Sequence, residues 1–542
     1  MRARFRKIAI TILLSLFLAF FTIGPVITLV LTSFDSSHGG LFGGPLILTA
    51  SSYFFVFSNS YTMKAFYDTL ELGVGTSALS LIIALPISYG LSWSNMPLKR
   101  FIRTTQMMGL GLPGFIVSLV MIVFTGSIYR TGFHVHSVLG VLLAMSISSV
   151  PFQVLYSTLS LERLDYRLIE AARVNGLGTF RTFFKITMPL LSPGIMSGFM
   201  VVFLLTTGSL SVPLLLAPPS FPVLAPLAYS ELLSFFNWSV ASADLTLIFG
   251  INIVAVIIYT FFSRRIPRTV SGKGFRVRRN GNPVVRYGLA AYSLLVSFIF
   301  LGEIFILVGY AFGKKWAGTP LPQGFTTNYF SSAISLYPFS PISTVIISSA
   351  AAVAAVLISL IISYGNRTGS VGAPVLLNFL VLTVFSLSNT IIGISYLSLF
   401  SNRQTGFLIN SIPLVLLFGY IFARLGYASN SVRISVESVS ESIVHSARLM
   451  VPKNRNGFAR IILPLVIPGL LEGFLLVFVR SSIDYASTVF LAPVNWTTLT
   501  LASYSFIITG ELGQGAALSL AVLAITMPLS YLLYRLRTKS SM

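Results

Sequence analysis

The tetrapeptide ISYG ends a long uncharged stretch at residues 87–90 and recurs, letter for letter, at residues 362–365. A short string can recur by chance, but the separation between the two copies, from position 87 to position 362, is shared by many other identical pairs. We call this separation the repeat offset. The pairs are Arg173 with Arg448, Phe183 with Phe458, Ile186 with Ile461, Pro189 with Pro464, Phe199 with Phe474, and LAP at 216–218 with LAP at 491–493. The sequence therefore predicts two copies of one structural unit.

The composition indicates a membrane protein. Of the 542 residues, 55% are hydrophobic and only 9% are charged, whereas a soluble domain has about 25% charged residues. Uncharged runs of about 20 residues, the length that spans a bilayer as a helix, recur along the chain. The predicted spans are 8–32, 68–94, 105–127, 137–157, 191–216, 242–263, 288–312, 341–364, 372–398, 407–427, 466–491 and 513–534. We expect an all-α fold of about 12 transmembrane helices, the first of them uncleaved.

The repeat and the charges predict the topology. Each copy has six spans. Because six is an even number, both copies have the same orientation in the membrane, as parallel repeats about an axis along the membrane normal. Most of the 36 Lys and Arg residues fall in alternate loops, which the positive-inside rule places in the cytoplasm with both termini. The net charge of +22 is thus expected to face the lipid bilayer and the cytoplasm, not nucleic acid. The predicted organisation is a first unit at 1–263, a basic cytoplasmic linker at 264–287 and a second unit at 288–542.

A polar loop at about 158–190 separates the fourth and fifth spans. It contains EAARVNG at 170–176 and, nine residues later, ITMP at 186–189. Apolar residues at helical spacing predict a short amphipathic helix before Gly176, which suits a left-handed C-terminal cap, and Pro189 suits the entry into the fifth span.

These spacings resemble the EAA signature of permease subunits in binding-protein-dependent ABC importers. The resemblance implies a type I importer permease fold, in which the loop docks into a cleft of an ATPase subunit. By this likeness the ATPase-coupling residues of the first loop are Glu170, Ala171, Ala172, Gly176, Ile186 and Pro189. A surface salt bridge of Glu170 to a neighbouring arginine is the alternative role for that carboxylate.

The second copy of the loop, at about 428–465, departs from the signature. His445 stands opposite Glu170 and Val451 opposite Gly176. The coupling residues that the resemblance carries over are Ala447, Ile461 and Pro464. We therefore expect the two ATPase contacts to be unequal.

Two charges fall deep in the eleventh predicted span. Arg480 and Asp484 stand one helical turn apart in FVRSSIDYAS, and a lone charge in the bilayer is costly, so they are expected to pair and to face the interior of the bundle. Either a place on the translocation path or a purely structural pair fits this pattern.

The leading hypothesis is the permease of an ATP-driven importer in the inner (plasma) membrane, with both permease units fused in one chain. Its expected partners are two copies of an ABC ATPase subunit in the cytoplasm and an extracytoplasmic substrate-binding protein. The resemblance points to ferric iron, otherwise to thiamine, phosphonate or polyamine. The alternative is a secondary transporter driven by an ion gradient. The chain contains no Walker motif, so we expect it not to be an enzyme, and we expect no catalytic residue, cofactor or metal site.

Overall fold

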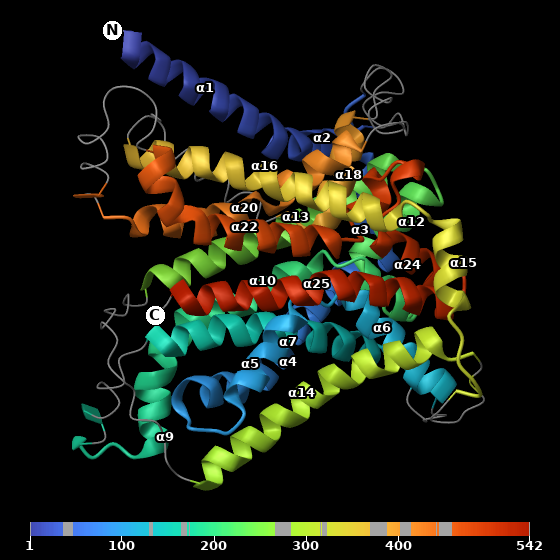
Figure 1. The fold of residues 1–542 in the computed structure, drawn as a ribbon. Helices are drawn as coiled ribbons and strands as arrows, with labels where there is room; N and C mark the ends of the chain where they lie inside the picture. The colour runs from blue at the N-terminus through green and yellow to red at the C-terminus, as the bar shows by residue number, and fades with distance from the viewer. Residues whose placement is uncertain are drawn as a thin grey trace. The chain divides into compact units, whose positions relative to one another are not determined.

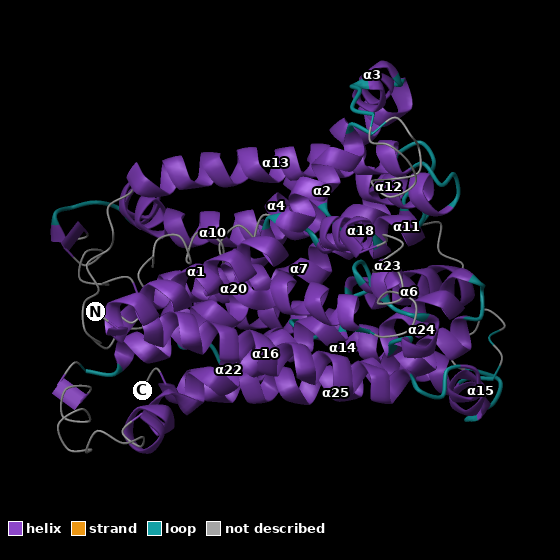
Figure 2. Ribbon diagram, turned by 90° about the horizontal axis from the view of Figure 1, so that it is seen from above, coloured by secondary structure: helices purple, strands orange, loops and turns teal. Residues whose placement is uncertain are grey.

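The computed structural model describes most of the chain. The described residues are 2–35, 47–128, 134–163, 171–172, 174–265, 283–314, 316, 322–368, 387–400, 413–440, 442–443 and 458–540. Figure 2 shows helices and loops in these residues, and no strand. Extended pairing there is limited to two isolated bridges, Asp35 with Leu48 and Gly313 with Phe325. The predicted all-α fold is confirmed.

The chain divides into two compact units, of which one comprises Ser60–Leu227 and Leu247–Thr326. Its helices, labelled in Figure 1 where there is room, are α4 (Ser60–Trp93), α5 (Lys99–Gly109), α6 (Gly114–Val123), the π-helix η1 (Phe124–Ile128), α7 (Val138–Arg163), α9 (Thr179–Thr182), the π-helix η2 (Phe183–Thr187), α10 (Met188–Thr207), α11 (Ser211–Leu216), the first residues of α12 (Leu224–Leu233), most of α13 (Trp238–Arg265) and α14 (Pro283–Phe312). Its centre is formed by α4, α7 and α10, which pack on one another.

The other unit comprises Met1–Asn59, Ala228–Thr246 and Thr327–Met542. Its remaining helices are α1 (Arg2–Thr22), α2 (Gly24–Ser33), α3 (Ser51–Ser58), α15 (Asn328–Leu336), α16 (Ser340–Thr368), α18 (Asn389–Phe400), α20 (Leu414–Ser438), the π-helix η4 (Phe458–Ile462), α22 (Leu463–Ser482), α23 (Thr488–Leu491), the 3₁₀-helix η5 (Val494–Trp496), α24 (Leu499–Ile508) and α25 (Leu512–Ser540). Here α16, α20 and α22 form the corresponding central trio.

The repeat seen in the sequence is present in the structure at the same offset. Helices α10 and α22 are separated by the repeat offset at both their first and their last residues, and so are α12 and α24. One buried hydrogen bond is also repeated: the amide of Leu224 donates to the Thr69 hydroxyl at 3.0 Å, and the amide of Leu499 donates to the Thr344 hydroxyl at 2.8 Å. The two halves therefore fold alike, down to single polar contacts.

The first helix of each sequence half packs on core helices of the other half. The Tyr396 hydroxyl of α18 donates to the Phe21 carbonyl of α1 at 2.5 Å, and the ring of Phe21 stacks on that of Phe422 of α20 at 4.8 Å. Likewise, the Tyr292 hydroxyl of α14 donates to the Ile83 carbonyl of α4 at 3.1 Å. The compact units therefore do not coincide with the sequence halves 1–263 and 288–542. The division of the chain into these two repeats stays a prediction.

Eight of the described helices are long and apolar enough to cross a membrane, or ten if each of two bent helix pairs counts as one span. Part of the predicted spans 372–398 and 407–427 lies outside the described residues. The chain is thus a multi-pass membrane protein, and the total of about 12 spans stays a prediction.

Three predicted spans are not single continuous helices in the structure. Within 105–127, α5 and α6 meet at a bend of 100°, because the sequence between them, LGLP, places Pro113 in an extended conformation with φ −67° and ψ 139°. The predicted spans 191–216 and 466–491 end early, at Thr207 and Ser482, and a short helix follows each break.

Candidate functional site

The root of the first polar loop is a rigid cluster. Trp93 at the end of α4 packs in the core against Leu161, near the end of α7 where the loop begins, and against Leu191, near the start of α10 where the loop ends. The Trp93 indole donates a buried hydrogen bond of 3.1 Å to the Leu161 carbonyl. A salt bridge of 2.5 Å joins Arg103 of α5 to Glu162 of α7. Both ends of the loop are therefore fixed to the same group of helices.

The loop itself ends a helical turn at Gly176. The amide of Leu177 donates to the Ala172 carbonyl at 3.1 Å, and the amide of Asn175 donates to the Ala171 carbonyl at 3.0 Å. Gly176 has φ +80°, which confirms the predicted left-handed cap. Ala172 is buried and Ala171 is exposed. Glu170 lies outside the described residues, so its assignment to coupling stays a prediction.

The second half of the motif leads into the fifth span. Ile186 lies half-buried in the π-helix η2, and the exposed Pro189 is the second residue of α10. Proline fits this first turn because its missing N–H would have no helical partner there, as the sequence predicted. The π-helix is of interest because single π-turns often occur at functional sites.

The second loop shares this exit and differs at its root. Ile461 is half-buried in the π-helix η4 and Pro464 is exposed at the start of α22, in the same register as the first copy. Ala447 and His445 lie outside the described residues. At the root, the Arg367 guanidinium of α16 donates a hydrogen bond to the carbonyl of Val439, which follows α20. In the first copy the donor at the root is the Trp93 indole.

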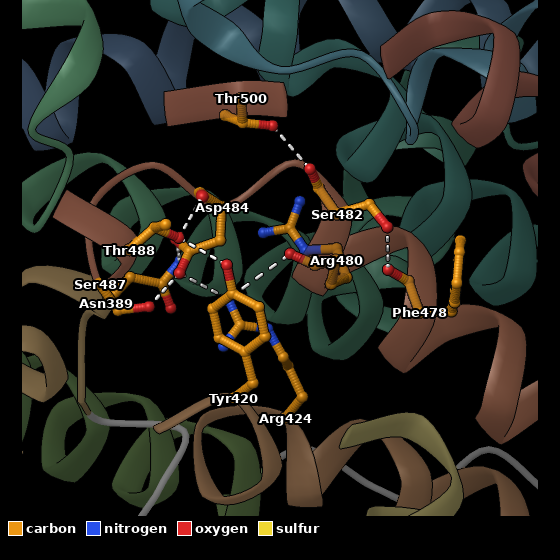
Figure 3. A network of polar contacts seen from close by, with 10 residues as sticks. All are labelled: Asn389, Tyr420, Arg424, Phe478, Arg480, Ser482, Asp484, Ser487, Thr488 and Thr500. Carbon is orange, nitrogen blue, oxygen red and sulfur yellow. Dashed lines mark hydrogen bonds and ion pairs between the residues drawn. The ribbon is translucent and has the colours of Figure 1, made fainter. Parts of the chain in front are cut away.

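Asp484 lies in a buried polar network at the break after α22 (Figure 3). Its carboxylate accepts a hydrogen bond from the Asn389 amide at 2.9 Å and another from the Ser487 hydroxyl. The Arg424 guanidinium of α20 forms an ion pair with it at 3.0 Å, and both side chains are 2% exposed. The carboxylate is thus surrounded by one guanidinium and two neutral hydrogen-bond donors.

Arg424 itself is held on two further sides. It lies over the Tyr420 ring at 4.6 Å from the centroid and donates to the Arg480 carbonyl at 3.5 Å. The Tyr420 hydroxyl in turn hydrogen-bonds the Thr488 hydroxyl at 2.5 Å. The network therefore joins α18, α20 and the α22–α23 break.

This arrangement corrects one prediction and identifies a residue that sequence reasoning missed. The ion-pair partner that the structure shows for Asp484 is Arg424, from another helix, whereas the expected partner was Arg480, which is half-buried. Arg424 lies near the end of the predicted span 407–427 and is buried within α20. The available signal was its place inside an apolar run, FARLG, where a charge needs a partner.

The network belongs to the second half alone. At the repeat offset, Arg424, Asp484 and Asn389 correspond to Ser149, Ser209 and Gly114. Because none of these three can form an ion pair, the first half has no counterpart of the Arg424–Asp484 pair at these positions.

Fold and site together define a multi-pass membrane protein built from two similar helical halves, with a polar loop fixed at its root and a buried ion pair. The family model for the inner membrane component of binding-protein-dependent transport systems matches residues 77–268. A molybdenum transport system permease protein of Escherichia coli is 30% identical over 158 residues, which are 26% of this chain and 68% of that protein. The chain belongs to this family of ABC importer permeases.

Other relatives extend the similarity. A protein of Haemophilus influenzae named as a ferric transport system permease is 24% identical over 473 residues, or 81% of this chain and 72% of the relative. A crystal structure of a bacterial ABC transporter involved in import of the polysaccharide alginate aligns with 49% of this chain and 98% of its own, at 18% identity and a TM-score of 0.35.

Proposed function

We propose that this chain forms the whole translocation pathway of an ATP-driven importer, with two fused permease units at 1–263 and 288–542. Two ATPase subunits bind its cytoplasmic loops at about 158–190 and 428–465, and both termini lie in the cytoplasm. A substrate-binding protein delivers the substrate on the opposite side. Each partner can shift the equilibrium between the inward-facing and outward-facing states only by the difference in its affinity for those two states.

The observation that carries this proposal is the common root of the first loop. Leu161 and Leu191, on its two sides, both pack on Trp93, so a force on the loop acts on α4, α7 and α10 as one group. Close-packed protein interiors have low compressibility and transmit strain. A loop fixed in this way is suited to transmit ATPase closure to the membrane helices.

We propose ferric iron as the substrate, because a relative that aligns with 81% of this chain is named for ferric transport. Thiamine, phosphonate and polyamine are the alternatives. Uptake of radioactive Fe³⁺ by cells that contain the permease, its ATPase and its binding protein tests this assignment, with competition by each alternative substrate in excess.

The coupling role is tested by charge reversal in the two loops. Glu170→Arg is expected to leave the protein in the membrane and to reduce co-purification of the ATPase, because the carboxylate would pair with a basic residue there. His445→Arg, at the matching place in the second loop, serves as the control and is expected to have less effect. Unchanged co-purification and transport in Glu170→Arg would show that the carboxylate has no coupling role.

A further inference from the structure

The short helix α15 lies across the end of two membrane-crossing helices. In Figure 1 it runs crosswise to α16 and α25, and in Figure 2 it is seen nearly end-on while those two helices lie lengthwise. Both α16 and α25 are long and apolar enough to cross a membrane, and all three helices belong to one compact unit. Because α15 runs crosswise to helices that span the bilayer, it has the orientation of a helix that lies in the plane of the membrane.

One side of α15 is fixed to the protein. Ala333 is fully buried in an apolar cluster with residues of α24 and α25, among them Leu499 and Leu518. The ring of Tyr337, directly after α15, meets the Phe506 ring of α24 edge-on, with centroids 5.5 Å apart. The other sides of α15 are therefore held in a defined position relative to α24 and α25.

The exposed apolar residues at the end of α15 continue into a stripe along α16. Leu336 is 64% exposed, and Phe339, in the turn between the two helices, is 66% exposed. The exposed apolar residues that follow on α16 recur at helical spacing and are Ile342, Val345, Ile346, Val353, Leu357 and Ile361. On a membrane-crossing helix such a stripe faces the acyl chains of the lipid. The exposed residues of α15 thus extend a surface that already faces lipid.

The polar groups of α15 suit contact with lipid better than contact with a protein. The hydroxyls of Ser331, Ser332 and Ser335 donate to carbonyls of the same helix at 3.0, 3.2 and 2.8 Å, so they are satisfied without water. The sequence has no charged residue between Lys315 and Arg367. Protein interfaces have a polar rim and intermolecular hydrogen bonds, whereas acyl chains require only apolar area.

The first half has a helix of the same kind. Helix α3 precedes α4 as α15 precedes α16, and its sequence, SSYFFVFS, has no charge either. The Tyr53 hydroxyl fixes it through hydrogen bonds to the hydroxyls of Ser33 and Thr246, at 2.7 and 2.8 Å, and Val56 is fully buried. The exposed side chains of α3 include three aromatic rings, those of Phe54, Phe55 and Phe57.

We propose that α15 and α3 are interfacial helices that bind the surface of the lipid bilayer, with Leu336, Phe339, Phe54 and Phe57 inserted among the acyl chains next to the headgroups. In the proposed topology this surface is the outer leaflet. The inference goes beyond the proposed transport function and does not depend on the substrate. It adds a partner, the lipid itself, at the end of α16 where the chain enters the membrane.

The test uses single cysteines, because the chain has none of its own. Leu336→Cys, Phe339→Cys and Phe57→Cys are each labelled with the fluorophore NBD in the purified full-length permease, which is then placed in phosphatidylcholine nanodiscs. Quenching by phosphatidylcholine that carries a nitroxide on its acyl chain near the headgroup reports contact with lipid. Quenching by iodide reports contact with water.

Two reference positions calibrate the quenching. Ile342→Cys lies on the exposed apolar stripe of α16 and is the reference for lipid. Glu437→Cys replaces a side chain that is 60% exposed and forms a surface salt bridge, and it is the reference for water. The labels on α15, its turn and α3 are expected to be quenched by the nitroxide lipid as strongly as the Ile342→Cys label, and several-fold less by iodide than the Glu437→Cys label.

Two outcomes would overturn the inference, for each helix separately. Iodide quenching equal to that of Glu437→Cys would place the residues in water, where they would be free to bind a protein. Quenching by neither agent would mean that another part of the chain covers them. Neither outcome would alter the proposed transport function, which rests on other residues.

Discussion

The ion pair of Arg424 with Asp484 allows a prediction in which the two partners are not equivalent. Arg424→Met removes the guanidinium and leaves Asp484 with the Asn389 and Ser487 donors, and a carboxylate can also take up a proton and become neutral. Asp484→Leu leaves Arg424 with the Tyr420 ring and one long hydrogen bond to a carbonyl, and arginine cannot be deprotonated in proteins.

Both single changes break a pair that is 2% exposed on each side, for which the expected loss of unfolding free energy is about 3–5 kcal/mol. The loss should be larger in Asp484→Leu than in Arg424→Met, and the double variant should recover much of it, because no buried charge is then left without a partner. The assay is denaturant unfolding of the purified protein in detergent, followed by tryptophan fluorescence.

The control lies on the same helix. Arg433 of α20 forms a salt bridge to Glu437 at 3.6 Å, with side chains 49% and 60% exposed, so Arg433→Met should cost only about 0.3–0.5 kcal/mol. Equal losses in Arg424→Met and Arg433→Met, or a double variant as unstable as the sum of its two single changes, would refute the reasoning.

Three further predictions concern the first loop. Gly176→Ala should strain the backbone by roughly 1–2 kcal/mol, because φ is +80° there, and should lower co-purification of the ATPase. The control is Gly178→Ala, because φ is not positive at Gly178 and no atom lies within 4 Å of an added Cβ. Trp93→Phe leaves the buried Leu161 carbonyl without its donor and should cost about 1–3 kcal/mol, measured as a lower unfolding midpoint; an unchanged midpoint would argue against a rigid root. Because the chain has no cysteine, Glu170→Cys should cross-link to a single cysteine in the ATPase cleft more efficiently than His445→Cys, and equal yields would contradict unequal loops.

The features that could be read from the sequence are those that depend on local pattern. The repeat offset predicted which elements would match, and the matching bonds of Thr69 and Thr344 occur at that offset. The left-handed Gly176 and the helix entry at Pro189 follow from the conformations that these residue types adopt.

The features that could not be read depend on contacts between distant residues. Hydropathy gives the length of an apolar run but not the positions of its bends. The predicted span 105–127 therefore did not include the break before Pro113, although glycine and proline occur there. The partner of Asp484 lies on another helix, far earlier in the sequence, where spacing along one helix gives no information.

We propose that this permease is driven by ATP hydrolysis, transmitted to the membrane helices through its cytoplasmic loops. The most direct measurement is transport of Fe³⁺ into proteoliposomes that contain the permease and its ATPase, with the loaded binding protein outside and ATP inside. We predict transport that requires ATP and the binding protein and that persists when ionophores collapse the ion gradients. Transport that continues without the ATPase and stops with the ionophores would contradict the account and favour a secondary transporter.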